Sequence, residues 1–333
     1  MRKEKEQLLK IIDAFSNKSI AVWGDLILDE YLYGTTRRIS REAPVLIISY
    51  RNKEYALGGG GNSLLNLKDL GARPVPVGVI GNDDAGRRIL RILKQMKVST
   101  DYVLTEKTYH TPIKTRILAG EESTRKQQIL RIDKEARVPE TKDLKRRLLN
   151  SIEKAHKNSD ALLISDYNYF TVKEDLFRKI LPGIKRVKKP VALDSRFRPT
   201  DFKGVTVLTP NEPEVEHALH IELDDKEEMV RKAGRQLLNR AEAQAVLITR
   251  GSKGMVLFER GRPAFEIPIF GSTNIVDVTG AGDTVVSVFT LALASGASFK
   301  QAAILANYAG GIVVMKKGTA SLSPQELKEV VVS

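Results

Sequence analysis

The sequence predicts a single α/β domain spanning residues 1–333, with a mostly parallel sheet, helices on both faces and a small additional β-sheet. Short β-branched runs alternate with amphipathic stretches, which is typical of a parallel sheet covered by helices. Hydrophobic residues make up 42% of the chain and charged residues 29%, as in ordinary globular proteins. Two regions without helical spacing break the alternation and predict the additional sheet.

Seven apolar runs are expected to be strands: 19–25, 73–81, 161–166, 190–194, 205–211, 245–251 and 254–259. Helices are expected at 61–71, 84–96, 141–156, 174–188 and 227–241. Polar residues follow five of the strands: Asp25, Asp166, Asp194, Asn211 and Thr249. Parallel sheets bind ligands beyond the carboxyl ends of their strands, so these residues predict one shared cleft.

The two exceptional regions are residues 31–57 and 109–133. The first contains a strand but no helix, and the second is expected to form two strands around a Gly-Glu-Glu turn. Together they predict a small sheet that covers the cleft as a lid or pairs with another subunit, because exposed strand edges favour pairing. A homodimer through this lid is the expected assembly.

The net charge of +13 points to an anionic partner or to simple solubility. Lys and Arg are scattered among acidic residues, without a basic block carrying aromatic residues, so a phosphorylated small molecule is favoured over nucleic acid. A nucleic-acid binder would instead show steeply salt-dependent binding to duplex DNA.

The chain contains no cysteine, which excludes disulfides, thiolate metal sites and a cysteine nucleophile. The N-terminus lacks an apolar signal core, and the uncharged run 284–299 is short for a membrane span. We therefore expect a cytoplasmic protein without a membrane partner.

The stretch DVTGAGDTVVSVFTLALASG (277–296) places small residues and an aspartate before a long apolar segment. A helix starting here would direct unsatisfied N–H groups and the positive end of its dipole outward, which suits a phosphate. Asp283 beside a phosphate is reasonable if it takes a proton from the hydroxyl that attacks phosphorus. The alternative is that Asp283 only caps the helix and the glycines form a turn.

Two further stretches support a ligand site. Four consecutive glycines (58–61) precede Asn62 at a helix start, which suits either a close approach to a ligand or a flexible loop. Asp25 and Asp29 are paired carboxylates that suit sugar hydroxyls, although they also suit a surface turn.

Asn211, Glu212 and Glu214 follow one strand, and such hard oxygen donors suit a magnesium–water shell. The TRGSKG stretch (249–254) is a turn with a free hydroxyl. No Walker motif and no G-x-G-x-x-G motif follows the first strand, which argues against P-loop enzymes and dinucleotide-dependent dehydrogenases. The two histidines in HALH (217–220) are expected on a helix surface.

The stretch 277–296 resembles the second signature of the ribokinase-like, or PfkB, carbohydrate kinases, and 58–90 resembles the first. The resemblance covers nearly the whole chain in order. Within that family, RISREAPV (38–45), together with LRIDKE, LISDY and LTPNEPEVE, is most similar to heptose-7-phosphate kinases. The resemblance implies one ribokinase-like domain with a small β-lid and phosphoryl transfer from MgATP to a sugar hydroxyl.

The resemblance also implies roles for individual residues. Asp283 would be the catalytic base, and the backbones of Gly280, Ala281 and Gly282 would form the anion hole. Asp29, Gly58, Gly59 and Asn62 would contact the sugar, with Asp25 close by and Asp166 on the other side. Asn211 and Glu214 would arrange Mg²⁺, Thr249 and Gly251 would lie along ATP, and Asn307 would help to build the adenine pocket. Asp277 and Thr279 match positions that hold a monovalent cation such as K⁺ in some members.

The chain departs from the heptose-kinase pattern at two places. Asn168-Tyr169-Phe170 replaces a small residue, lysine and glycine, and DSRFRP (194–199) replaces Asp-Pro-Lys-Gly. Arg196 and Arg198 are candidate replacements for one of the two missing lysines, because arginine binds phosphate bidentately.

The expected substrate is D-glycero-D-manno-heptose 7-phosphate, and the alternatives are another sugar, another sugar phosphate, a nucleoside, or a non-enzymatic sensor. Cationic residues inside the cleft would favour a phosphorylated substrate; the candidates are Arg37, Arg38, Lys114, Arg116, Arg196 and Arg198. No H-x-G-H motif occurs, so a nucleotidyltransferase domain is not expected.

Overall fold

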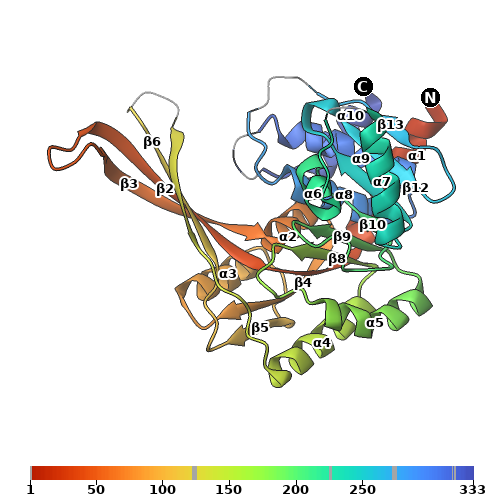
Figure 1. Cartoon of the computed structure of the whole chain (residues 1–333), viewed down its shortest axis with the longest axis horizontal. Coiled ribbons are helices and arrows are strands. Elements are labelled where there is room, and N and C mark those ends of the chain that lie inside the picture. Colours follow the sequence, from red (N-terminus) through yellow and green to blue (C-terminus); the bar gives the residue numbers. More distant parts are fainter. Residues whose placement is uncertain (1, 122–125, 225–226, 272–275, 317, 319) are drawn as a thin grey trace.

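A computed structural model describes residues 2–121, 126–224, 227–271, 276–316, 318 and 320–333. A nine-stranded sheet lies at its centre, in the order β13-β12-β11-β10-β9-β8-β1-β4-β5 (Figure 1). The strands from β11 to β5 run parallel, whereas β12 and β13 are antiparallel additions at one edge. The predicted mostly parallel sheet is therefore confirmed.

The strands of this sheet are β1 (Ser19–Gly24), β4 (Arg73–Gly81), β5 (Val103–Glu106), β8 (Ala161–Asp166), β9 (Val191–Ser195), β10 (Val207–Leu208), β11 (Ala245–Thr249), β12 (Met255–Glu259) and β13 (Phe265–Ile267). All seven expected strands are present, but the expected strand 205–211 contracts to β10. Pro210 explains the early end, because proline has no N–H with which to continue the ladder.

Helices cover both faces of the sheet. They are α1 (Arg2–Asp13), α2 (Gly60–Asp69), α3 (Asp84–Gln95), α4 (Lys142–Lys157), α5 (Glu174–Val187), α6 (Glu212–Leu219), α7 (Glu227–Arg240), α8 (Ala281–Ala294), α9 (Phe299–Val313) and α10 (Pro324–Val332). Residues of α4 to α7 share one apolar core with one face of the sheet, and the other helices share a second core. Alternate residues of β1 enter the two cores, with Val22 in one and Trp23 in the other, so the central strand is buried on both faces.

A second sheet projects from the body as a long, twisted arm (Figure 1). It contains β3 (Leu46–Gly59), β2 (Leu26–Ile39), β6 (Ile113–Gly120) and β7 (Gln127–Lys134), in that order. The expectation of one strand within 31–57 was wrong, since two long antiparallel strands occupy this region and extend beyond it. The two strands expected within 109–133 are present, whereas Glu122 of their expected turn lies outside the described residues.

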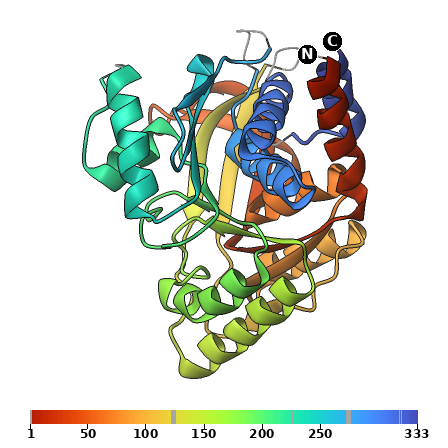
Figure 2. The ribbon, with the colours of Figure 1, turned by 90° about the vertical axis from the view of Figure 1, so that its right-hand side faces the viewer.

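Only Asp25 separates β1 from β2, so the chain passes directly from the central sheet into the projecting sheet. On the return, β3 leads without a gap into α2. Helices α1 and α10 pack side by side (Figure 2), at the end of the molecule away from the projecting sheet (Figure 1). Within the part of the chain that the structure describes, no helix has the length and apolarity to cross a membrane.

Candidate active site

Asp283 lies in the first turn of α8, at the third helical position. The preceding N-cap is Gly280, whose φ of 81° is a left-handed conformation that favours glycine. Among the described residues no side chain caps this helix, and the Asp283 side chain points elsewhere. The capping alternative for Asp283 is therefore wrong, and the first-turn N–H groups of Gly282 and Asp283 remain available for an anion.

Three side chains converge on the Asp283 carboxylate, which is only 5% exposed. The Asn62 amide donates to Oδ2 over 2.8 Å, and the Tyr167 hydroxyl lies 3.0 and 3.2 Å from the two oxygens. Ser63 Oγ is 3.5 Å from Oδ1. Burial raises the pKa of Asp283 to about 6, although the hydrogen bonds from Asn62 and Tyr167 oppose this rise. A carboxyl with this pKa is a competent base near neutral pH.

The glycine-rich segment brings β3 and α2 close to the start of β2. A Cβ at Gly58 would lie 2.8 Å from the Asp29 carboxyl carbon, and one at Gly59 would lie 2.7 Å from the Asp25 carbonyl oxygen. The glycine backbone thus closely approaches the Asp29 carboxylate and the Asp25 carbonyl of the protein itself. Asp29 is buried and forms a 2.9 Å ion pair with Arg116 of β6. Sugar contacts by Asp29, Gly58, Gly59 and Asn62 stay predictions.

The Asp25 carboxylate lies beneath the site and is 1% exposed. It accepts the backbone N–H groups of Tyr167, Tyr169 and Thr171 over 2.9, 3.1 and 3.0 Å. Burial, with repulsion from Asp166, nevertheless raises the pKa of Asp25 to about 6. This carboxylate therefore fixes the loop that follows β8, and a direct sugar contact by Asp25 stays a prediction.

Asp166 is similarly engaged within the protein. Arg198 forms a 2.7 Å ion pair with Oδ1, and the Ser195 hydroxyl donates to Oδ2 over 2.7 Å. Arg198 is therefore a structural partner of Asp166, and Arg116 is that of Asp29. Both arginines were candidates for phosphate binding, and their pairing reduces the charge that either offers a ligand. A sugar contact by Asp166 also stays a prediction.

Two further carboxylates, Asp194 and Glu214, interact electrostatically with Asp283. Burial and repulsion from Glu214, Asp283 and Asp166 raise the pKa of Asp194 well above its usual range. The pKa of Glu214 rises to about 7, mainly through burial, against the hydrogen bonds of the capping box that it forms with Asn211 at the start of α6. This local excess of negative charge suits a divalent cation.

Direct coordination of such a cation by the protein alone is not favoured. In the described ranges, no three histidine or carboxylate side chains lie close enough together to hold a metal ion. Binding through water is consistent with Mg²⁺, which keeps several waters and few carboxylate ligands.

The residues expected along the nucleotide lie at neighbouring strand ends. Asn211, which follows β10, forms an isolated parallel β-bridge with Thr249, the last residue of β11. Gly251 follows β11 with a φ of 53°. Asn307 of α9 donates to the Pro268 carbonyl over 2.9 Å. Asp277 accepts the N–H groups of Thr279 and Gly318, which shapes the turn before α8. Nucleotide and cation binding by these residues stay predictions.

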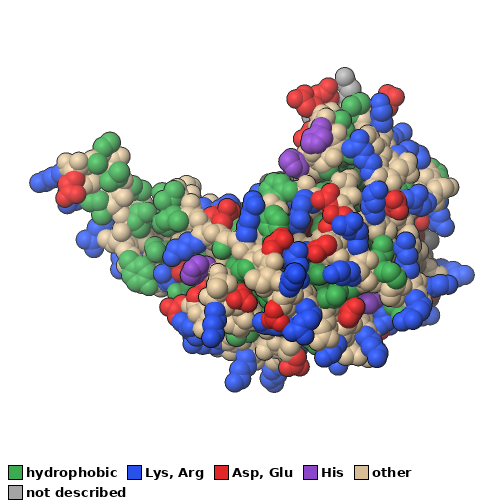
Figure 3. Space-filling view, turned by 60° about the horizontal axis from the view of Figure 1, so that its bottom comes forward, with side chains coloured by type: hydrophobic (Ala, Val, Ile, Leu, Met, Phe, Trp, Pro, Cys, Tyr) green, Lys and Arg blue, Asp and Glu red, His purple; other side chains and the backbone are tan. Residues whose placement is uncertain are grey.

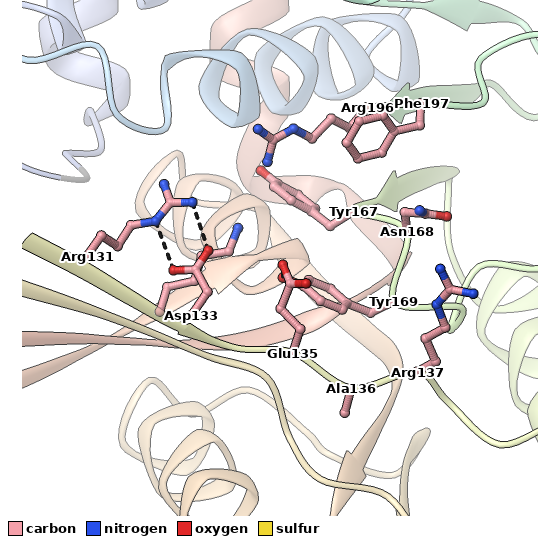
Figure 4. A pocket seen from close by; sticks show the side chains of 11 residues that line it. Arg131, Asp133, Glu135, Ala136, Arg137, Tyr167, Asn168, Tyr169, Arg196 and Phe197 are labelled. Atoms are coloured by element: carbon pink, nitrogen blue, oxygen red, sulfur yellow. Dashed lines mark hydrogen bonds and ion pairs between the residues drawn. The ribbon is translucent and has the colours of Figure 1, made fainter.

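A cavity of about 610 Å³ opens beside Tyr167, between the projecting sheet and the carboxyl ends of the strands. Four cationic residues line it: Lys114, Arg131, Arg137 and Arg196. Figure 4 shows Arg196 and Tyr167 with their polar ends directed toward one another, and Arg131 paired with Asp133. The cavity contains more cations than carboxylates, so an anionic group fits it.

Two of the six cations proposed from the sequence, Lys114 and Arg196, therefore line the cavity. Arg37 and Arg38 are exposed on β2 and are not among its lining residues. Sequence reasoning missed Arg131 and Arg137, although LRIDKE contains one of them. It also missed Tyr167, whose hydroxyl reaches the Asp283 carboxylate across 116 residues of sequence.

Comparisons with known proteins identify the family of the chain. The sequence model of the family described as "pfkB family carbohydrate kinase" matches residues 17–326. The bifunctional protein HldE of Pelobacter propionicus is 37% identical over 327 residues, which cover 97% of this chain but 65% of that protein. The chain thus spans slightly less than two thirds of this relative.

Solved structures share the fold at lower identity. Arabidopsis thaliana ribokinase, complexed with ribose and ATP, has a TM-score of 0.71 at 21% identity, covering 94% of this chain and 98% of its own. Escherichia coli phosphofructokinase-2, in complex with potassium, has a TM-score of 0.75 at 18% identity, covering 95% and 98%. These likenesses confirm the ribokinase-like fold.

The buried carboxylates with raised pKa values predict how the stability of the fold changes with pH. The pKa values of Asp25, Asp283 and Glu214 lie at about 6, 6 and 7 in the fold, above the ordinary values of 3.8 and 4.5. The folded state therefore binds more protons than the unfolded state between these limits, so the contribution of these groups to stability falls as pH rises from about 4 to about 7.

Replacing Asp194 with asparagine should relieve the repulsion between its carboxylate and those of Glu214, Asp283 and Asp166. Without nucleotide or Mg²⁺ at pH 8, we expect Asp194→Asn to raise the unfolding temperature by roughly 2–4 °C. The difference should shrink toward pH 4, where the carboxyl is protonated. Thermal melts across this range would check it, with the exposed Asp101→Asn as control. An equal difference at pH 4 and pH 8 would contradict the electrostatic explanation.

Proposed function

The chain belongs to the pfkB family of carbohydrate kinases, and from this premise we propose that it phosphorylates a sugar phosphate with MgATP. The proposed substrate is D-glycero-D-manno-heptose 7-phosphate, and the proposed product is the 1,7-bisphosphate. The observation that carries the proposal is the position of Asp283, a buried carboxylate at the start of a helix, which Tyr167 of the cationic cavity contacts. One kinase domain with the β2-β3-β6-β7 sheet as its lid would perform this reaction.

In this reaction the anomeric hydroxyl gives its proton to Asp283 while its oxygen attacks the γ-phosphorus of ATP. The new O–P bond forms as the bond from phosphorus to the bridging oxygen breaks, and ADP leaves. The N–H groups at the start of α8 would stabilise the charge on the transferring phosphoryl group. Asn62 would orient the base throughout.

Mg²⁺, when bound with ATP, supplies positive charge that neutralises the phosphates. Glu214 and Asp194 would hold it through water, which fits the excess of carboxylates at this point. Asp277 and Thr279 would contribute to a site for a monovalent cation, a proposal supported by the related phosphofructokinase-2 that was solved with potassium.

The cationic cavity favours a phosphorylated acceptor over a plain sugar or nucleoside. Its lysine and arginines lie on β6, on β7 and after β7 and β9, so they surround the end of a substrate whose other end meets Asp283. The heptose itself is proposed from the resemblance of residues 38–45 to the heptose-7-phosphate kinases.

The first test is Asp283→Asn, which removes the base with little change in volume. Turnover should fall by roughly 10²–10⁴-fold because general-base catalysis is lost. Coupled ADP-release assays would measure it, with the exposed Glu153→Gln as control and thermal melts to check folding. Near-wild-type turnover would refute the role of Asp283.

The second test addresses the phosphate end of the substrate. Arg196→Ala should raise KM for heptose 7-phosphate by about 10- to 100-fold, the effect of one charge-assisted hydrogen bond, and leave KM for ATP unchanged. The assay would include fructose 6-phosphate, ribose, fructose and adenosine, with Arg235→Ala on the exposed surface of α7 as control. If KM for unphosphorylated acceptors rises equally, Arg196 does not bind phosphate. Turnover on another acceptor alone would exclude the heptose.

The lid also supports a proposal of homodimerisation. Most of the strongly exposed large apolar side chains in the described residues lie on this sheet or its connections: Ile39, Val45, Leu46, Tyr50, Ile129, Leu130 and Ile132. In Figure 3 hydrophobic side chains are visible along the projecting arm. Such a surface suits contact with a second copy of the chain.

The double variant Ile129→Asp with Ile132→Asp should be monomeric, because it places two charges on this apolar surface. Light scattering after gel filtration would show half the mass of the wild-type particle. Val187→Asp, at a similarly exposed apolar residue on α5, should retain the wild-type mass. A monomeric wild type would refute the dimer.

A further inference from the structure

Tyr167 connects the cationic cavity to the proposed base. Its side chain lines the cavity, and its hydroxyl lies 3.0 Å from Oδ1 and 3.2 Å from Oδ2 of Asp283. The Lys114 ammonium lies 5.1 Å from the centre of its ring, which offers a cation–π contact on the cavity side. Tyr167 therefore lines the cavity and at the same time contacts the Asp283 carboxylate through its hydroxyl.

The loop that carries Tyr167 has an unusual and well-fixed backbone. Asn168 and Phe170 have φ values of 67° and 69°, a left-handed conformation that is costly for a bulky residue such as Phe170. The three hydrogen bonds to Asp25 compensate by fixing the N–H groups of residues 167, 169 and 171. The Trp23 indole also donates to the Thr171 carbonyl over 3.1 Å.

Phe170 is further held by cations on its ring faces. The Arg137 and Arg198 guanidinium carbons lie 4.7 and 5.2 Å from the ring centre. The strained conformation thus persists because buried hydrogen bonds and packing oppose its relaxation, and strain of this kind is often found at functional sites. Its effect here is to place one hydroxyl against one carboxylate.

We propose that Tyr167 is a positioning residue for phosphoryl transfer: with Asn62, its hydroxyl fixes the orientation in which the Asp283 carboxylate meets the acceptor hydroxyl. This proposal rests on the proposed function, in which Asp283 is the base. Asn62 donates to Oδ2 from α2, and the Tyr167 hydroxyl contacts the carboxylate from the loop after β8. The two donors come from different parts of the fold, so together they restrict rotation of the carboxylate.

The same hydrogen bond stabilises the ionised base. Burial and the Asp29 carboxylate on β2 favour the protonated form of Asp283, whereas Asn62, Tyr167 and Lys114 on β6 favour the ionised form. Asp194 and Glu214 add repulsion from β9 and α6. Because Tyr167→Phe removes one stabilising contact and none of these charges, the pKa of Asp283 should rise.

The test is the pH profile of kcat/KM for wild type and Tyr167→Phe. The acidic limb should move upward by about one pH unit, the effect of losing one hydrogen bond to a charged group. The alkaline plateau should fall less than about tenfold, since the base itself is retained. Tyr169→Phe is the matched control, because its hydroxyl belongs to the same loop but bonds Glu135, so its acidic limb should stay in place.

A different result would overturn the proposal. An unmoved acidic limb, whether the plateau is retained or falls strongly, would mean that Tyr167 does not act through Asp283. Asp25→Asn serves as a second variant, because an amide accepts the three N–H groups less well and its NH₂ group repels them. It should move the limb in the same direction as Tyr167→Phe.

A measurement without turnover separates this proposal from the proposed function. In ¹³C NMR, the Tyr167 Cζ resonance is the one that Tyr167→Phe removes. It should shift with a midpoint near pH 6, reporting ionisation of Asp283, and Asp283→Asn should abolish most of that step. A step that persists in Asp283→Asn would refute the contact, whereas a correct step without sugar phosphorylation would refute the function alone.

Discussion

The Asp25 carboxylate, buried where β1 passes into β2, holds together the segments on which the site depends. Its side chain binds the loop after β8, its N–H donates to Ser165 at the end of β8, and its carbonyl accepts the N–H of Gly60 at the start of α2. The strand β2, the loop that carries Tyr167 and the helix that carries Asn62 therefore share one anchor. Their relative positions fix both donors to Asp283, so the geometry of the Asp283 carboxylate depends on a residue that does not touch it.

The site also concentrates charge that the free protein holds at a cost. Asp25, Asp194, Glu214 and Asp283 all have raised pKa values, with burial as the largest cause. On the cavity side the imbalance is reversed, with cations in excess of carboxylates. A cation beside the carboxylates and a phosphate in the cavity would relieve both imbalances, so the site is matched to a pair of ligands of opposite charge.

Sequence reasoning predicted the sheet and the five amphipathic helices, because hydrophobic periodicity is a local signal. The shared cleft expected from the polar strand ends stays a prediction, since none of its five residues lines the cavity beside Tyr167. Sequence reasoning also singled out Asp283 and Asn62, which the fold brings into contact. It could not predict that Arg116 and Arg198 are paired with Asp29 and Asp166, because those pairings depend on the register between strands and loops distant in sequence. Tyr167 was missed for a related reason: a tyrosine after a buried strand carries no local sign of its partner, and the left-handed Asn168 and Phe170 that direct it are visible only in the backbone.

The order of strands has a consequence for synthesis on the ribosome. Among the strands of the large sheet β1 is translated first, and it lies in the interior of that sheet, between β4 and β8. β4 follows within about fifty residues, but β8 begins at residue 161, so one edge of β1 stays open while more than a hundred further residues are translated. Nascent chains in this interval expose an apolar strand edge, which makes them targets for chaperones and for misassociation. Slow codons placed before β8 would prolong this interval, and rapid translation through it would protect the yield of folded protein.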